Sequence, residues 1–340
     1  MYQLRNLGVL FLVIAVCLLS KLVSAANVYD ANYKSEVYAT FPSSGLGWLK
    51  DMAFDPSGNL YITARGLSRD TTDGAVYRVD TQGNGSVFAT GLYYPTGIVY
   101  STSLEYGDNL YISDAGNSYA GSGGGIKRVD MNGNVSLFSS PSNQSSAINI
   151  DQTGNYGNRL YVATRGLDHM DAILPNGTIQ HFSDFPYNMS GGGPVTLDFD
   201  LTGSYGNSMF IANNGSGSNS GIFEMDALGN PIRFAPEITT AGCLGFDNGT
   251  DFDGDMFVSS MLQSDSYWSI YRVSPDEEIT KFADFASGNL TWFEFGPDGA
   301  LYTLENAGGT AVVTRITPVP EPASIILLSF GAVFLKRRIS

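Results

Sequence analysis

The sequence predicts an all-β fold, a six-bladed β-propeller with a short apolar helix at each terminus. Three observations lead to this prediction. A Leu-Tyr-Ile-like element recurs six times at intervals of 45–50 residues. Each copy belongs to a set of segments with strand-like composition. The last copy lacks one such segment, and a matching segment occurs near the N-terminus.

The recurring element begins at Leu60, Leu110, Leu160, Met209, Met256 and Leu301. An apolar segment that ends in an acidic turn precedes it, as in 197–203. Two further segments follow it, as in 126–130 and 136–138. Alternating β-branched and aromatic residues bounded by Gly, Asn and Asp are signals of strands and hairpins. Four strands in a repeat of this length are typical of one propeller blade.

The ends of the repeat region indicate how the ring closes. The sixth unit ends after its third strand, 312–316, whereas residues 34–40 match the fourth strand of the first unit, 84–90. An N-terminal strand that completes the last blade leaves no unpaired edge across the joint. Six blades are therefore predicted, and a seven-bladed ring or an open solenoid is the alternative.

Residues 1–25 have the pattern of a secretory signal peptide. A basic start at Arg5 precedes an apolar run, and small residues precede the expected cleavage site. Cleavage is predicted after Ala25, with Ala26 as the alternative. Lipidation at Cys17 is disfavoured, because Val16 stands where a small residue is required and the apolar run continues beyond Cys17.

The C-terminal segment, 318–340, follows the predicted propeller domain, 26–317. It contains Pro320, Glu321 and Pro322, then an apolar stretch, 323–335, then the basic residues Lys336, Arg337 and Arg338. Thirteen helical residues reach only about 20 Å, which is short of a ~30 Å hydrocarbon core. Snorkelling basic side chains or a thinned bilayer would make up part of the difference. An ordinary C-terminal membrane anchor is the alternative interpretation.

This order of elements resembles the PEP-CTERM sorting signal over about the last 22 residues. The resemblance implies recognition by an exosortase, a membrane transpeptidase-like enzyme that acts at the Pro-Glu-Pro region. Proteins with this signal are typically exported by Gram-negative bacteria that make exopolysaccharide. The chain is therefore expected at the cell surface or in the extracellular matrix, with transient or permanent membrane association through its C-terminal helix.

The central region resembles NHL-repeat and gluconolactonase (regucalcin)-like six-bladed propellers. The segments 55–62 and 110–114, with the sequences Asp-Pro-Ser-Gly-Asn-Leu-Tyr-Ile and Leu-Tyr-Ile-Ser-Asp, carry the resemblance, which extends over about residues 28–317. These repeats reflect strand packing, so they indicate a fold and not an activity.

Charge and cysteine content restrict the partners and the chemistry. Residues 26–322 hold 13 of the 18 Lys and Arg residues and all 33 Asp and Glu residues, a net charge of −20. Such a surface repels phosphate backbones, so nucleic acid is excluded as a partner. Calcium, neutral glycans and basic proteins remain compatible with this charge as partners. Cys243 has no partner after signal cleavage and is predicted to be a buried core residue.

The segment 247–255 is the best local candidate for a metal site. Asp251, Asp253 and Asp255 alternate around a glycine, and Ca²⁺ prefers such oxygen ligands. The alternative is structural, because sister loops in the other repeats occupy the same place. In that interpretation the segment is a hairpin with an aromatic plug.

A second candidate site lies where the chain leaves each Leu-Tyr-Ile strand. Polar residues occur there in five repeats: Arg65, Asp114, Arg165, Asn213 and Glu305. A ring of such residues at a channel mouth would suit a sugar or a metal ion, and a solvated rim is the alternative. Trp48, His169 and Trp292 are expected nearby.

The resemblance to lactonases implies a divalent metal at the propeller centre, which polarises a lactone carbonyl and activates water. Asp114 matches one position of that pattern, and Asn149 and Asn213 would supply amide oxygens. The first unit departs from the pattern, because it has 47–51 in place of an acidic Glu-Gly-Pro opening. The enzyme hypothesis requires Asp114, Asn149 and Asn213 to converge.

Two functions are compatible with these observations. The first is an exported, non-enzymatic binding or structural module that recognises a glycan or a surface protein. The alternative is a metal-dependent, lactonase-like hydrolase.

Overall fold

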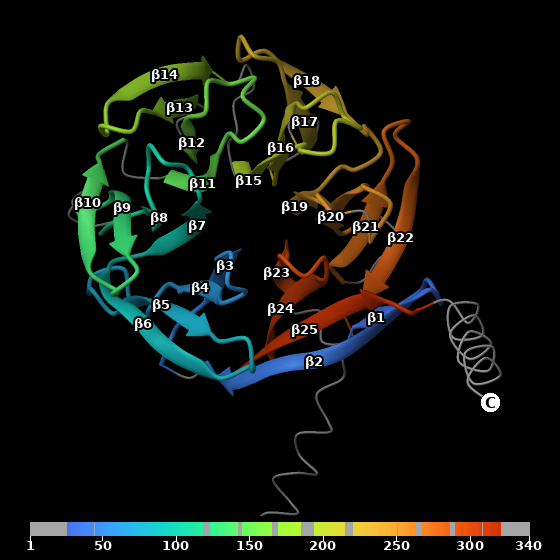
Figure 1. Cartoon of the computed structure of the whole chain (residues 1–340), viewed down its shortest axis with the longest axis horizontal. Helices are drawn as coiled ribbons and strands as arrows, with labels where there is room; N and C mark the ends of the chain where they lie inside the picture. The colour runs from blue at the N-terminus through green and yellow to red at the C-terminus, as the bar shows by residue number, and fades with distance from the viewer. Residues whose placement is uncertain are drawn as a thin grey trace, which may run out of the picture.

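The computed structural model describes residues 26–43, 45–117, 123–141, 145–164, 169–184, 194–214, 220–249, 251–262, 267–285, 290–307 and 309–320. They form six antiparallel sheets arranged as blades around a central axis (Figure 1). The predicted six-bladed propeller is therefore confirmed. The two predicted apolar helices lie outside the described residues. Within the described ranges, no helix is long and apolar enough to cross a membrane.

Blades 1 to 3 follow one another along the chain. Blade 1 contains β3 (Leu49–Phe54), β4 (Leu60–Ala64), β5 (Gly74–Val79) and β6 (Gly85–Leu92). Blade 2 contains β7 (Pro95–Ser101), β8 (Asn109–Asp114), β9 (Gly125–Asp130) and β10 (Val135–Ser139). Blade 3 contains β11 (Ser145–Ile150), β12 (Leu160–Thr164), β13 (His169–Ile173) and β14 (Ile179–Asp184).

Blades 4 to 6 complete the ring, and the last two recruit N-terminal strands. Blade 4 contains β15 (Pro194–Phe199), β16 (Met209–Asn213), β17 (Gly221–Met225) and β18 (Pro231–Phe234). Blade 5 contains β19 (Ala241–Phe246), β20 (Met256–Ser260), β21 (Ser269–Val273), β22 (Ile279–Asp284) and β1 (Asn27–Val28). Blade 6 contains β23 (Leu290–Phe295), β24 (Leu301–Ala307), β25 (Thr310–Pro318) and β2 (Tyr33–Pro42).

The recurring Leu-Tyr-Ile element forms the second strand of every blade. β4 and β12 are buried along their whole length, because a neighbouring blade covers each face. The outermost strands have many exposed residues, as β6 does. Continuous apolar runs are thus found where a strand is covered on both faces.

The closure of the ring occurs as predicted. Strand β2 pairs antiparallel with β25, from Tyr33 opposite Pro318 to Pro42 opposite Thr310. The backbone N–H of Val319 also donates to the carbonyl of Asn32 (2.6 Å). Strand β1 adds a fifth strand to blade 5 through β22, which the repeat pattern did not predict. The N-terminal segment therefore joins two adjacent blades.

Tyrosine side chains join several neighbouring blades. The hydroxyl of Tyr156, in the β11–β12 hairpin, donates to the carbonyl of Met225 (2.5 Å) and accepts from the N–H of Met209 (2.9 Å). Tyr106 and Tyr205 make the same pair of bonds to blades 3 and 5. Each hydroxyl thus satisfies one backbone donor and one acceptor at the edge of the next blade.

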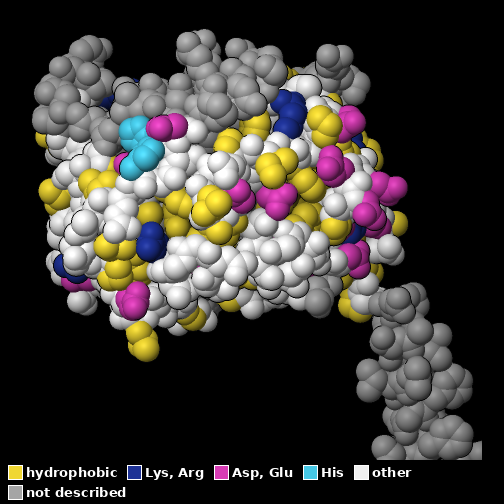
Figure 2. Space-filling view, turned by 90° about the horizontal axis from the view of Figure 1, so that it is seen from above, with side chains coloured by type: hydrophobic (Ala, Val, Ile, Leu, Met, Phe, Trp, Pro, Cys, Tyr) yellow, Lys and Arg dark blue, Asp and Glu magenta, His cyan; other side chains and the backbone are white. Residues whose placement is uncertain are grey.

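The outer wall over β14 and β18 is shown in Figure 2. The two histidines, cyan in that view, lie side by side, with ring centroids 5.8 Å apart. His169 and His181 both face the carboxylate of Asp171, at 3.4 and 3.7 Å. His169 therefore belongs to a polar cluster on blade 3.

Candidate functional site

The first strands of the six blades surround a central cavity of about 510 Å³. It extends from the level of Asp51, Thr196 and Trp292 to the turns that join the first and second strands of the blades. Pro56 and Gln152 line it at that end. The cavity is therefore on the axis, and its mouth is on the face that carries these turns.

On the first strands, three carboxyl groups and one amide line this cavity: Asp51 on β3, Asn149 on β11, Asp198 on β15 and Glu294 on β23. Asp55, Asp247, Gln152 and Asn248 line it beyond the ends of these strands. Asn149, Asp198 and Glu294 occupy one repeat position, the residue of the first strand that pairs with the Tyr or Phe of the Leu-Tyr-Ile-like element. The same position holds Ala53, Val99 and Gly245 in the other blades. The repeat thus places polar side chains at one level of the axis in three blades, and apolar residues or glycine in the rest.

The polar side chains of the cavity bind the backbone of neighbouring strands. Asp51 accepts from the N–H groups of Met52 (2.7 Å) and Ile98 (3.0 Å), and Ile98 lies on the first strand of blade 2. Asn149 donates to the carboxylate of Asp198 (2.8 Å), which also accepts from the N–H of Phe246 at 3.3 Å. Because the first strand of each blade has one unpaired edge, these bonds satisfy donors that would otherwise lack partners.

Burial in the cavity shifts the acidity of all three carboxyl groups. It raises the pKa of Asp51 and of Asp198 to about 7, although backbone N–H donors oppose the shift. The pKa of Glu294 is raised well above its usual value by burial and by the charges of Asp198 and Asp51. At neutral pH the carboxyl groups of Asp51 and Asp198 therefore exchange protons readily, and burial favours the protonated form of Glu294.

Oxygen ligands of this kind suit a hard cation such as Ca²⁺. However, no three histidine, cysteine, aspartate or glutamate side chains are grouped for metal binding in the described part of the chain. Asn149 donates to Asp198, and Asp51 and Asp198 accept from backbone N–H groups, so these side chains already have partners where the lactonase resemblance implies metal ligands.

Three of the predicted channel-mouth residues lie at one end of the blades, but they do not line the cavity. Asp114, Asn213 and Glu305 pair with the first residues of β7, β15 and β23, which places them at the end opposite the cavity mouth. Asn149 lines the cavity, whereas Asp114 and Asn213 do not. The predicted convergence of these three residues is therefore wrong. The reason is that residues after the second strand and late residues of the first strand lie at opposite ends of a blade.

Asp114 and Arg65, two of the predicted channel-mouth residues, bind groups at that end of the blades. Asp114 is fully buried, and its carboxylate accepts from the N–H groups of Tyr93, Tyr94 and Gly116 (2.8–3.0 Å). Its role is to hold the segment that enters β7. Arg65 lies at the same end, beside Tyr94. Arg165 lies outside the described residues.

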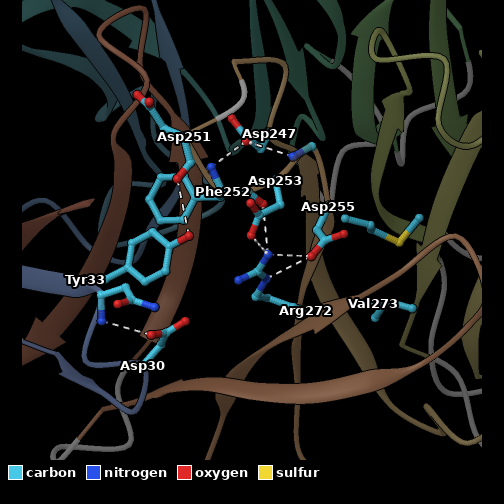
Figure 3. A network of polar contacts seen from close by, with 12 residues as sticks. Asp30, Tyr33, Asp247, Asp251, Phe252, Asp253, Asp255, Arg272 and Val273 are labelled. Carbon is cyan, nitrogen blue, oxygen red and sulfur yellow. Dashed lines mark hydrogen bonds and ion pairs between the residues drawn. The ribbon is translucent and has the colours of Figure 1, made fainter. Parts of the chain in front are cut away.

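The predicted calcium loop contains an internal cation (Figure 3). The guanidinium of Arg272 binds the carboxylates of Asp253 and Asp255, each at 2.6 Å. Asp251 points away from this group and approaches Gly299. The three predicted metal ligands are thus divided, and Arg272 takes the place that a metal would need. The hairpin alternative agrees better with this arrangement.

Cys243 is buried on β19, as predicted, and burial raises the pKa of its thiol well above the usual value. Its Sγ lies 3.3 Å from the carbonyl oxygen of Phe293, on the first strand of blade 6. The thiol therefore acts as a packed core group.

The fold resembles that of several solved enzymes. A gluconolactonase from Xanthomonas campestris superposes with a TM-score of 0.61 and 12% identity, over 87% of this chain and 95% of that chain. The soluble aldose sugar dehydrogenase of Escherichia coli gives 0.56 and 12%, over 84% and 100%. Virginiamycin B lyase from Staphylococcus aureus gives 0.54 and 11%, over 84% and 100%. No protein-family model and no curated protein matches the sequence.

These similarities establish the propeller fold that this chain shares with gluconolactonases and sugar dehydrogenases. At such low identity they do not extend to the residues of the cavity. Sequence analysis missed Asp51, Asp198 and Glu294. Aligning the repeats by their turn aspartates would have identified Asp198, because the motif 197–200 sets it beside Asn149 of 148–151.

Proposed function

We propose that the chain is a lactonase-like hydrolase that acts on a small polar ester or lactone in the central cavity. One observation carries this proposal: an axial cavity of about 510 Å³ contains three carboxyl groups with raised pKa values, about 7 for Asp51 and Asp198 and well above the usual value for Glu294. Carboxyl groups tuned in this way are typical of acid–base sites. The fold shared with a gluconolactonase supports the same interpretation.

In the proposed reaction, Asp198 acts as the general base and Glu294 as the proton donor. The carboxylate of Asp198 takes a proton from water while the water oxygen bonds to the carbonyl carbon of the substrate. The protonated Glu294 then transfers its proton to the ring oxygen as the carbon–oxygen bond of the lactone breaks. Proton exchange with solvent restores both groups. Asn149, bound to Asp198, is a positioning residue for that carboxylate.

The experiment measures hydrolysis of glucono-1,5-lactone and related sugar lactones by acid release, corrected for spontaneous hydrolysis. We expect Asp198→Asn and Glu294→Gln each to lower kcat/KM by about 10²-fold or more. Asp130→Asn is the matched control, because that aspartate caps the β9–β10 turn on the surface. Equal rates for the wild type and both cavity variants, in folded protein, would contradict the proposal.

A second candidate function is a non-enzymatic binding module. The hydrogen bonds that Asp51 and Asp198 accept from backbone N–H groups of adjacent blades favour it, because they give the carboxylates a structural role. If the chain is a binding module, Asp198→Asn and Glu294→Gln lower the melting temperature, and the wild type hydrolyses no tested lactone. Lactone hydrolysis and thermal melting, both measured on the wild type and these variants, thus distinguish the two functions.

We also propose that the chain is exported and sorted through its ends. The support is the signal-like pattern of 1–25, the Pro320-Glu321-Pro322 tail and the basic residues 336–338. Mass spectrometry of the protein from a Gram-negative host with an exosortase tests this. A mature N-terminus at Ala26 and loss of the tail are expected, and an intact tail in that host contradicts the sorting step.

A further inference from the structure

A cluster of cationic and aromatic side chains lies at the end of the propeller opposite the cavity mouth. The guanidinium carbons of Arg65 and Arg69 lie 4.4 and 3.9 Å from the ring centroid of Tyr94. Arg65 also donates to the hydroxyl of Tyr94 (2.9 Å). The two guanidinium groups therefore cannot be farther apart than the sum of the two ring distances. Both cations thus lie against one tyrosine ring, and two like charges against one side chain favour a nearby anion.

The backbone holds this cluster in place. The N–H of Arg65 donates to the carbonyl of Trp48 (3.0 Å), and the N–H of Gly66 donates to the carbonyl of Leu46 (2.9 Å). Gly47 forms a bridge with Gly66, and a Cβ on Gly47 would lie 1.6 Å from the carbonyl oxygen of Gly66. The segment that carries Trp48 is thus fixed against the segment that carries Arg65.

Two of the nearby carboxylates, those of Asp73 and Asp114, accept hydrogen bonds from other groups. Asp73 accepts from the N–H of Leu67 (3.0 Å) and from the hydroxyl of Thr71 (2.7 Å), which folds the loop that bears Arg69. Asp114 accepts from the N–H groups of Tyr93 and Tyr94. Asp70 is exposed on the same loop. Burial by itself raises the pKa of Tyr94, but the hydrogen bond and charge of Arg69 and the charge of Arg65 outweigh it and lower that pKa.

An exposed aromatic residue, Trp48, lies on the segment whose backbone is hydrogen bonded to Arg65. The side chain of Trp48 is 55% exposed, although tryptophan is usually well buried. A flat apolar ring beside guanidinium groups suits a ligand that has both a C–H face and a carboxylate, since arginine pairs with carboxylates in a forked geometry. A uronic acid residue of an oligosaccharide has both parts.

We propose that Arg65, Arg69 and Trp48 form a binding site for an acidic saccharide, in which the arginines bind the uronate carboxylate and the indole stacks on the sugar ring. The site is separate from the central cavity and does not depend on the proposed hydrolase activity. The net charge of the body, −20, does not oppose binding of a short ligand. At physiological salt, charges more than about 8 Å away are largely screened.

The experiment is calorimetric titration of the full propeller with trigalacturonic acid at about 150 mM salt, a condition under which distant charges are screened. Arg65→Gln and Arg69→Gln are each expected to weaken binding about tenfold or more, because each removes a charge-assisted pair. Trp48→Ala is expected to weaken both this binding and that of the neutral reference, maltotriose. Arg128→Gln is the matched control, since it removes an exposed arginine from blade 2.

Two outcomes overturn the proposal. One is trigalacturonate binding that is unchanged in both Arg65→Gln and Arg69→Gln, or reduced equally in Arg128→Gln. The other is binding of inorganic phosphate as tight as that of trigalacturonate, together with no effect of Trp48→Ala. The second result would identify a general anion site with no part for a sugar. Because Arg69 is exposed on a loop, its variant tests the site even if Arg65→Gln fails to fold.

Discussion

The ring of Tyr33 lies parallel to the ring of Phe252, with centroids 4.7 Å apart and an angle of 8° between the planes. Phe252 occupies the hairpin position that tyrosines hold in blades 2, 3 and 4, and it has no hydroxyl to bind the next blade. Tyr33, from the closing strand β2, covers it instead. The contact therefore connects the ring closure to blade 5.

This stacking predicts a measurable coupling. Tyr33→Ala and Phe252→Leu should each destabilise the propeller, and the double variant should lose less than the two single losses combined. An aromatic pair contributes about 0.5–1.5 kcal/mol beyond its buried area. A double-mutant cycle based on urea unfolding measures the coupling energy. Strict additivity would show that the two rings act independently.

Tyr156→Phe is predicted to destabilise the fold by about 1–3 kcal/mol, because it leaves the N–H of Met209 and the carbonyl of Met225 without their partner. Thermal melting of this variant is compared with that of Tyr100→Phe, which alters a partly exposed tyrosine. Equal melting temperatures for the two variants would show that the bridging hydroxyl has no net effect on stability.

Arg272→Met is predicted to create calcium sensitivity that the wild type lacks. In the native protein the guanidinium bridges Asp253 and Asp255, so added Ca²⁺ should not shift the melting temperature. Without it, two carboxylates face each other, and Ca²⁺ should stabilise the variant by mass action. Asp253→Ala combined with Arg272→Met is the control, and it should lose the effect. A calcium-dependent shift in the wild type would restore the metal hypothesis for this loop.

The cavity carboxyl groups predict a decline in stability between about pH 4 and pH 7. Burial raises the pKa of Asp51 from 3.8 to about 7, so the folded state binds this proton more tightly than the unfolded state does. The resulting stability is fully present below pH 3.8 and is lost as the pH rises to 7. Each pKa unit corresponds to about 1.4 kcal/mol, so the change is on the order of a few kcal/mol.

The pH effect is measured as a difference between proteins. Asp51→Asn carries a constant penalty, because its amide replaces one acceptor, but it has no ionisation in this window. Relative to the wild type it should therefore gain stability from pH 4.5 to pH 8. Asp130→Asn should show no such trend, because the hydrogen bonds of Asn134 lower the pKa of Asp130 and confine its effect to more acidic conditions. Parallel curves for wild type and Asp51→Asn would sink the prediction.

Most of the fold was predictable because the same strand pattern recurs in the six repeats. Each Leu-Tyr-Ile element corresponds to a strand covered on both faces, and the match between 34–40 and 84–90 predicts the closing strand. Strand β1 was not predictable from the repeat, since two residues carry no periodicity. Once β2 pairs with β25, the residues just before β2 lie beside β22, and β1 pairs there.

The candidate site was less predictable, because channel positions deviate from the repeat. Asp198 and Glu294 stand where other blades have Ala53 or Gly245, and a search for shared residues passes over such differences. The metal hypothesis for Asp253 and Asp255 had a different weakness. Their spacing resembles a calcium loop, but Arg272 lies 17 residues beyond Asp255 and reaches them only through the β20–β21 pairing.

The closure of blade 6 places both ends of the described chain at one corner. Asn32 and Val319 are hydrogen bonded, and Ala26 is held by the hydroxyl of Ser35 (2.7 Å). The propeller thus has no structurally required starting point. A circular permutant that joins Pro320 to Ala26 by a short linker and opens between Asn132 and Gly133 would begin with β10. That strand would then close blade 2 from the N-terminal side, as β2 closes blade 6 in the natural order.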